Sequence, residues 1–123
     1  MKNQTILLAG AVFMALAVLL GAFGAHALKK VLSPDMLAIY KTGVEYQFYH
    51  ALGLLLIGVI GFHIRSKYLR WAGLFISIGI IIFSGSLYVL TLSGIKALGA
   101  ITPIGGLSFV VGWIFLAIAI WKR

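Results

Sequence analysis

Hydrophobic residues occur in four long runs, and only short polar gaps separate them. The runs extend over about residues 5–28, 42–64, 71–92 and 103–121. A helix of about 20 apolar residues crosses the hydrocarbon core of a membrane, so each run is long enough to be a transmembrane helix. Because the gaps are short, neighbouring helices are expected to run antiparallel. The pattern therefore predicts an all-α, four-helix antiparallel bundle that forms one transmembrane domain over residues 1–123.

The first run has one feature of a secretory signal, because Ala25-His26-Ala27 fits an A-x-A cleavage site. Its apolar part is longer than the roughly 7–15 residues of a signal core. We therefore expect a true first helix. Its glycines and alanines would allow another helix to approach closely.

Two segments carry helix-start signals. Ser33 fits an N-cap, with Pro34 at the first helical position and Asp35 in the first turn. The second helix is thus expected to begin near Pro34, in the membrane interface, before its spanning part. Thr102 and Pro103 predict an N-cap and a first position for the fourth helix in the same way.

The composition supports a membrane location. Hydrophobic residues make up 63% of the chain and charged residues 10%, and the mean hydropathy is +1.14. Soluble domains carry about 25% charged residues, so this chain is an integral membrane protein. The net charge of +8 would suggest a nucleic-acid partner in a soluble chain. Here the basic residues lie in the gaps, as headgroup anchors do, so we expect membrane lipids as partners and no nucleic acid.

The basic residues also predict an orientation in the cell (inner) membrane. Lys and Arg are more frequent on the cytoplasmic side of bacterial membrane proteins. On the side of both termini lie Lys2, Arg65, Lys67, Arg70, Lys122 and Arg123. On the other side lie Lys29, Lys30, Lys41 and Lys96. We therefore predict that both termini are cytoplasmic.

Polar residues are expected to gather in the half of the membrane opposite the termini. In an antiparallel bundle, the end of helix one, the start of helix two, the end of helix three and the start of helix four face the same side. The only glutamate, Glu45, is about 6 Å deeper than Lys41 at 1.5 Å per residue, and His50 is about 13 Å deeper. The candidate cluster or ligand-binding residues are His26, Glu45, Tyr46, Tyr49, His50, Ser84, Ser86, Tyr88 and Thr102.

Three interpretations of this cluster are open. It forms a structural hydrogen-bond network between helices, a site for an ion, proton or small ligand, or a catalytic centre. No metal-binding histidine spacing and no nucleophile motif accompanies it, and the chain has no cysteine. We therefore expect no enzyme activity, no metal site and no cofactor.

The polar segments also carry a family resemblance. They comprise Gly21-Ala-Phe-Gly-Ala-His26, Tyr40-x-Thr-Gly-Val-x-Tyr-Gln47, Tyr49-His-Ala-Leu-Gly53, Ser84-Gly-Ser-Leu-Tyr88, Thr102-Pro-Ile-Gly-Gly106 and Gly112-Trp113. Together and in this order, they resemble the YwdK/YgdD family of small bacterial inner-membrane proteins, a domain of unknown function. The resemblance covers essentially the whole chain. It implies a four-helix protein of the cell membrane and brings no activity, substrate or cofactor.

Two classes of function follow as hypotheses. The first is a non-enzymatic membrane module that binds a lipid headgroup or a partner protein, or stabilises an oligomer. The alternative is a small proton- or ion-coupled transporter or channel that acts as an oligomer. Because bundles of this size often oligomerise, a second copy of the chain is a candidate partner in both. A membrane enzyme acting on lipid or quinone ranks last, since paired carboxylates and an activated nucleophile are missing.

Overall fold

The computed structural model describes residues 1–123 and consists of helices and short connections. The long helices are α1 (Asn3–His26), α2 (Pro34–Ile60), α3 (Lys67–Gly79), α4 (Gly85–Ser93) and α5 (Thr102–Trp121). Two 3₁₀ turns, η1 (Leu28–Lys30) and η3 (Lys96–Ala100), and a π-helical turn, η2 (Ile80–Ser84), complete the chain. Since α3, η2 and α4 follow one another without a break, they form a single span.

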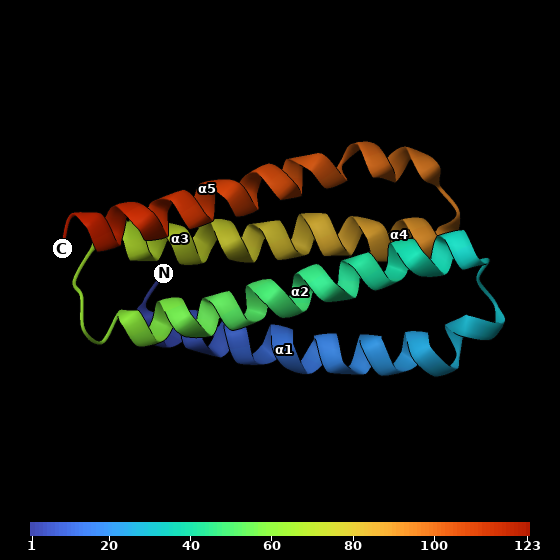
Figure 1. The fold of residues 1–123 in the computed structure, drawn as a ribbon, viewed down its shortest axis with the longest axis horizontal. Helices are drawn as coiled ribbons and strands as arrows, with labels where there is room; N and C mark the ends of the chain where they lie inside the picture. The colour runs from blue at the N-terminus through green and yellow to red at the C-terminus, as the bar shows by residue number, and fades with distance from the viewer.

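The helices pack as an antiparallel four-span bundle (Figure 1). Helix α1 lies beside α2, and the continuous span of α3 and α4 lies beside α5 (Figure 1). Both termini are at one end, and the links through η1 and η3 are at the other (Figure 1). All four spans are long and apolar enough to cross a membrane. The predicted all-α, four-helix bundle is thus confirmed.

The predicted start of the second helix is confirmed, and the fourth helix begins one residue earlier than predicted, so the capping role of Thr102 is wrong. Helix α2 begins at Pro34, and the Ser33 hydroxyl accepts a hydrogen bond from the Met36 N–H at 3.2 Å. Helix α5 already includes Thr102, because the preceding residue, Ile101, has helical backbone angles. Thr102 therefore does not cap the helix. Its hydroxyl instead lies 2.6 Å from the hydroxyl of Ser86 on α4.

The third span contains a π turn that its apolar pattern did not predict. The Gly85 N–H donates to the Ile80 carbonyl, five residues earlier, instead of four as in an α-helix. The turn occurs where this span meets α5. A Cβ atom added at Gly105 would lie only 2.7 Å from the Phe83 Cα. The π turn and a glycine together permit the two backbones to touch.

The interior is apolar toward the end that carries the termini. The main core consists of Ile6, Leu54, Ile57, Leu69, Ala72, Ile76, Ile80, Phe109 and Ala119. Large apolar side chains also cover the outside of the bundle, including Leu8 and Leu19 on α1, Leu56 on α2 and Leu107 on α5. Such a surface would cause a soluble protein to aggregate, whereas it suits helices surrounded by lipid.

Candidate functional site

Helix α2 supplies most of the polar groups inside the bundle. Tyr40, Gln47 and His50 lie on its buried face, together with Val44 and Ala51. Gln47 is 3% exposed and His50 6% exposed. The spacing of seven and three residues places the three polar side chains along one side of the helix. From there they reach α1, α4 and α5.

Gln47 connects three helices. Its amide nitrogen donates to the Phe13 carbonyl on α1 at 2.7 Å, and its amide oxygen accepts from the Tyr88 hydroxyl on α4 at 2.6 Å. The Tyr88 ring lies against the Tyr40 ring, with 5.3 Å between their centroids. The Tyr40 hydroxyl donates to the Leu20 carbonyl on α1 at 2.6 Å. Two side chains of α2 thus bond to carbonyls of α1 inside the bundle.

His50 connects α2 to α5. The Trp113 indole Nε1–H donates to His50 Nε2 at 3.0 Å, and His50 Nδ1 lies 2.7 Å from the Tyr46 carbonyl oxygen. An indole nitrogen only donates and a carbonyl only accepts. Nε2 must therefore be unprotonated, and Nδ1 must carry the proton of a neutral ring. The imidazole also stacks on Phe109, with ring centroids 3.5 Å apart.

Hydroxyl groups connect the remaining helices. Ser84 in the π turn is fully buried and donates to the Gly43 carbonyl on α2 at 2.7 Å. Ser86 donates to the Phe83 carbonyl at 2.9 Å and bonds to Thr102 on α5. Ser108 on α5 donates to the Phe75 carbonyl on α3 at 2.7 Å. Each span is consequently joined to a neighbour by at least one side-chain hydrogen bond.

Five of the nine candidate residues form side-chain hydrogen bonds within the bundle, and the other four have exposed side chains. His50, Ser84, Ser86, Tyr88 and Thr102 bond within the bundle, and we call them, with Tyr40, Gln47, Ser108 and Trp113, the polar network. His26 is exposed at the end of α1, and Glu45 is exposed on α2. Tyr46 and Tyr49 are also largely outside, with 38% and 56% exposure. Tyr46 contributes its carbonyl to His50 and packs its ring against Phe83, with centroids 4.6 Å apart.

Four members of the polar network were not among the predicted site residues: Tyr40, Gln47, Ser108 and Trp113. Two of them had a usable signal. Trp113 lies in the middle of an apolar run, far from either interface, where its N–H needs a partner. Gln47 lies three and four residues from the apolar Val44 and Ala51, which places it on their buried face.

No residue of the polar network lines either of two cavities at the opposite end, where the termini are. One of these cavities is lined by residues such as Asn3 and Arg65, and the other by His63 and Arg123. No group of three or more histidine, cysteine, aspartate or glutamate side chains could hold a metal ion. What the arrangement provides chemically is a set of hydrogen bonds between helices.

Four apolar spans around a small hydrogen-bonded interior define a small multi-span membrane protein. The comparisons with known proteins give its family. Residues 20–106 match the family model described as "Protein of unknown function (DUF423)". The chain therefore belongs to this family, which confirms the resemblance to the YwdK/YgdD group.

The relatives match over nearly their full length. The UPF0382 membrane protein YwdK of Bacillus subtilis is 41% identical over 120 residues, which are 97% of this chain and 98% of that protein. A UPF0382 membrane protein of Staphylococcus aureus (strain USA300) is 51% identical over 119 residues, 97% of each chain. A third, from Staphylococcus haemolyticus, is 47% identical over the same share of each chain. No solved structure matches this chain.

Proposed function

We propose that this protein is a non-enzymatic membrane module, in which the polar network holds the four spans together and the surfaces meet lipid or a partner protein. One observation carries the proposal: both polar atoms of the Gln47 amide and both ring nitrogens of His50 have partners inside the bundle. With these partners in place, neither residue presents an unbonded nitrogen or oxygen atom to a ligand. These two residues are engaged in joining helices.

The exposed position of Glu45 supports the same proposal. Glu45 lines neither of the two cavities at the end with the termini and lies outside the polar network. It is one helical turn from Lys41, which we expect near the headgroups. A carboxylate there interacts with water and headgroups, without the cost of burial in hydrocarbon. We further propose that both termini are cytoplasmic, on the basis of the Lys and Arg count.

A pair of substitutions tests the structural role. His50→Ala should lower the thermal unfolding temperature of the detergent-solubilised protein, because it removes one hydrogen-bonded contact and leaves the Trp113 N–H without a partner. Glu45→Gln is the matched exposed control and should leave the unfolding temperature and the oligomeric state unchanged. A His50→Ala protein as stable as the parent would overturn the proposed role.

A flux measurement tests the transport alternative. The protein is reconstituted into vesicles with a pH gradient, and the movement of protons and monovalent cations is compared with that of empty vesicles. We expect no difference between them. If the protein supports flux and Glu45→Gln abolishes it, the transporter hypothesis is favoured over the membrane module.

A further inference from the structure

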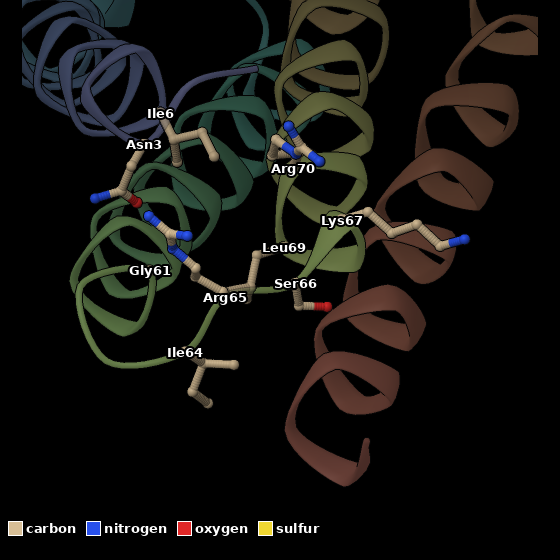
Figure 2. A pocket seen from close by; sticks show the side chains of 9 residues that line it. All are labelled: Asn3, Ile6, Gly61, Ile64, Arg65, Ser66, Lys67, Leu69 and Arg70. Atoms are coloured by element: carbon tan, nitrogen blue, oxygen red, sulfur yellow. The ribbon is translucent and has the colours of Figure 1, made fainter. Parts of the chain in front are cut away.

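A cavity lies at the end with the termini, between the first turn of α1, the end of α2 and the start of α3. Its volume is about 490 Å³, which is in the usual range of about 300–1,000 Å³ for small-ligand sites. Its polar lining consists of Asn3, Arg65, Ser66, Lys67 and Arg70, and we call it the basic pocket. Figure 2 shows the Arg65 side chain extending toward Asn3, and Arg70 lying near Ile6.

The basic pocket has positive charge without internal compensation. None of its lining residues is acidic, and the chain contains only two acidic residues, Asp35 and Glu45. Both precede the end of α2 at Ile60, Glu45 by 15 residues and Asp35 by 25 residues. At 1.5 Å per residue, they are about 22 Å and about 38 Å away along the helix. Neither acidic side chain therefore reaches Arg65 or Arg70, and both arginines are exposed to an external anion.

Asn3 provides a second, independent observation. Its side-chain nitrogen Nδ2 is buried and has no hydrogen-bond partner. It is the single buried side-chain polar atom in the molecule without one. Burying an amide donor without a partner is unfavourable, so a rotation of the Asn3 side chain that brings Nδ2 to an acceptor in the pocket would be favoured. An oxygen atom of a bound anion would supply that acceptor.

The start of α3 adds to the field in the pocket. Helix α3 begins at Lys67, with the hydroxyl of Ser66 accepting from the Tyr68 N–H at 3.2 Å. The first N–H groups of a helix and its dipole favour a negative charge at this position. The Lys67 ammonium lies 5.4 Å from the centre of the Tyr68 ring, so its charge is partly engaged outside the pocket. Arg65 and Arg70 are left as the main cations.

We propose that the basic pocket binds a phosphate group through the guanidinium groups of Arg65 and Arg70. Guanidinium groups match the geometry of phosphate oxygens and form paired, charge-assisted hydrogen bonds with them. Basic pockets between transmembrane helices on the cytoplasmic side bind phospholipid headgroups, and Ile6, Ile64 and Leu69 give this pocket an apolar wall beside its charges. The inference rests on the proposed function, in that it specifies what a membrane module of this kind binds.

The test uses the full chain, purified in an uncharged detergent and in a buffer free of phosphate. Native mass spectrometry and thermal unfolding are recorded with short-chain phosphatidylglycerol, with short-chain phosphatidylcholine and with inorganic phosphate. We expect retention of phosphatidylglycerol over phosphatidylcholine, with a higher unfolding temperature. If inorganic phosphate stabilises the protein equally, and phosphatidylglycerol adds nothing, the ligand is a soluble phosphate compound and the site still stands.

Variants assign the binding to the pocket. Arg65→Gln and Arg70→Gln should each weaken binding about tenfold, because each removes a charge-assisted pair of hydrogen bonds. Lys122→Gln is the matched control, since it removes one positive charge at the same end from a residue that does not line the pocket. If a glutamine variant fails to fold, Arg70→Lys retains the charge without the planar fork and should still weaken binding.

Two results would overturn the inference. One is retention of neither phosphatidylglycerol nor inorganic phosphate by the parent protein above its retention of phosphatidylcholine. The other is an equal loss of binding in Lys122→Gln, which would mean a general charge effect. Neither result depends on the flux or stability measurements of the proposed function, so the failure of one proposal can be distinguished from the failure of the other.

Discussion

His50 and Trp113 form a matched pair of hydrogen-bond acceptor and donor. The indole has one N–H to donate, and the neutral imidazole has one nitrogen to accept it. Within a membrane there is no water to replace a lost partner. The ring of Trp113 also packs over Gly53, where an added Cβ atom would lie 2.8 Å from the indole. The hydrogen bond and the close contact therefore fix the distance between α2 and α5 together.

We expect Trp113→Phe to lower the free energy of unfolding by about 1–2 kcal/mol, because His50 Nε2 then lacks a donor. The measurement is unfolding of the protein in mixed micelles, followed by circular dichroism. Trp121→Phe is the control, since Trp121 is 88% exposed at the end of α5. Equal stability of the two variants would mean that the hydrogen bond contributes nothing.

The bond between Gln47 and Tyr88 can be isolated with a double-mutant cycle. Gln47→Leu and Tyr88→Phe should each destabilise the protein, because each leaves a buried group without its partner. The double variant should lose less than the sum of the two, by about 0.6 kcal/mol, the average coupling of hydrogen bonds between membrane helices. A strictly additive pair would contradict the coupling that the 2.6 Å distance implies.

Single residues were only partly predictable. His50, Ser84, Ser86 and Thr102 were among the expected polar residues, and the structure gives each a partner inside the bundle. The sequence did not separate them from the exposed Glu45. Glu45 and His50 are about 140° apart around the helix, and the sequence does not say which of these directions faces a neighbouring helix. Which of two neighbouring polar residues is buried depends on where the next helix lies, and α5 is remote in sequence.

Among the helices, the third span is the one whose backbone departs from regular geometry. In the π turn at Ile80–Ser84, a backbone hydrogen bond spans five residues instead of four. Ser84 in this turn donates to α2, and Phe83 contacts α5. Such turns occur mainly as short insertions and often at functional sites. Here it gives the span the geometry to contact α2 and α5 at the same level.

Alanine substitutions test the contact between the π turn and α5. Gly105→Ala should destabilise the bundle by about 1–3 kcal/mol, because its Cβ would overlap the Phe83 backbone and force the two helices apart. Gly106→Ala is the matched control one residue later, where the nearest atom would be at 3.8 Å. The comparison is made by thermal unfolding. A Gly105→Ala variant as stable as Gly106→Ala would contradict the close approach.

The molecule as a whole is asymmetric along its length. The half away from the termini contains both acidic residues and the hydrogen bonds of Tyr40, Ser84, Ser86 and Thr102, and the bond between His50 and Trp113 lies near the middle. The end with the termini carries the basic pocket above an apolar core. A helical bundle with chemically different ends has a preferred orientation in the membrane, and the majority of Lys and Arg residues is the basis of our proposal that the end with the termini is cytoplasmic.

Single cysteines test the orientation, because the chain has none of its own. Ala97→Cys, on the exposed η3 turn, should react with a membrane-impermeant maleimide in intact cells. His63→Cys, exposed at the end with the termini, should react only after the cells are made permeable. The reverse pattern would invert the proposed topology and place the basic pocket on the outer side.

The sequence alone determined the class of protein, the number of spans, their antiparallel order and the start of α2. These follow from local properties: the length of the apolar runs, the short gaps and the Ser33-Pro34 pair. Tertiary structure decided the rest. The pairing of Trp113 with His50, the role of Gln47, the π turn and the cavity around Asn3, Arg65 and Arg70 all join segments that are distant in the chain. Lipid tails are as apolar as the helix surface, so they favour no particular face of an apolar helix. Which polar atom is buried therefore depends on where the neighbouring helix lies.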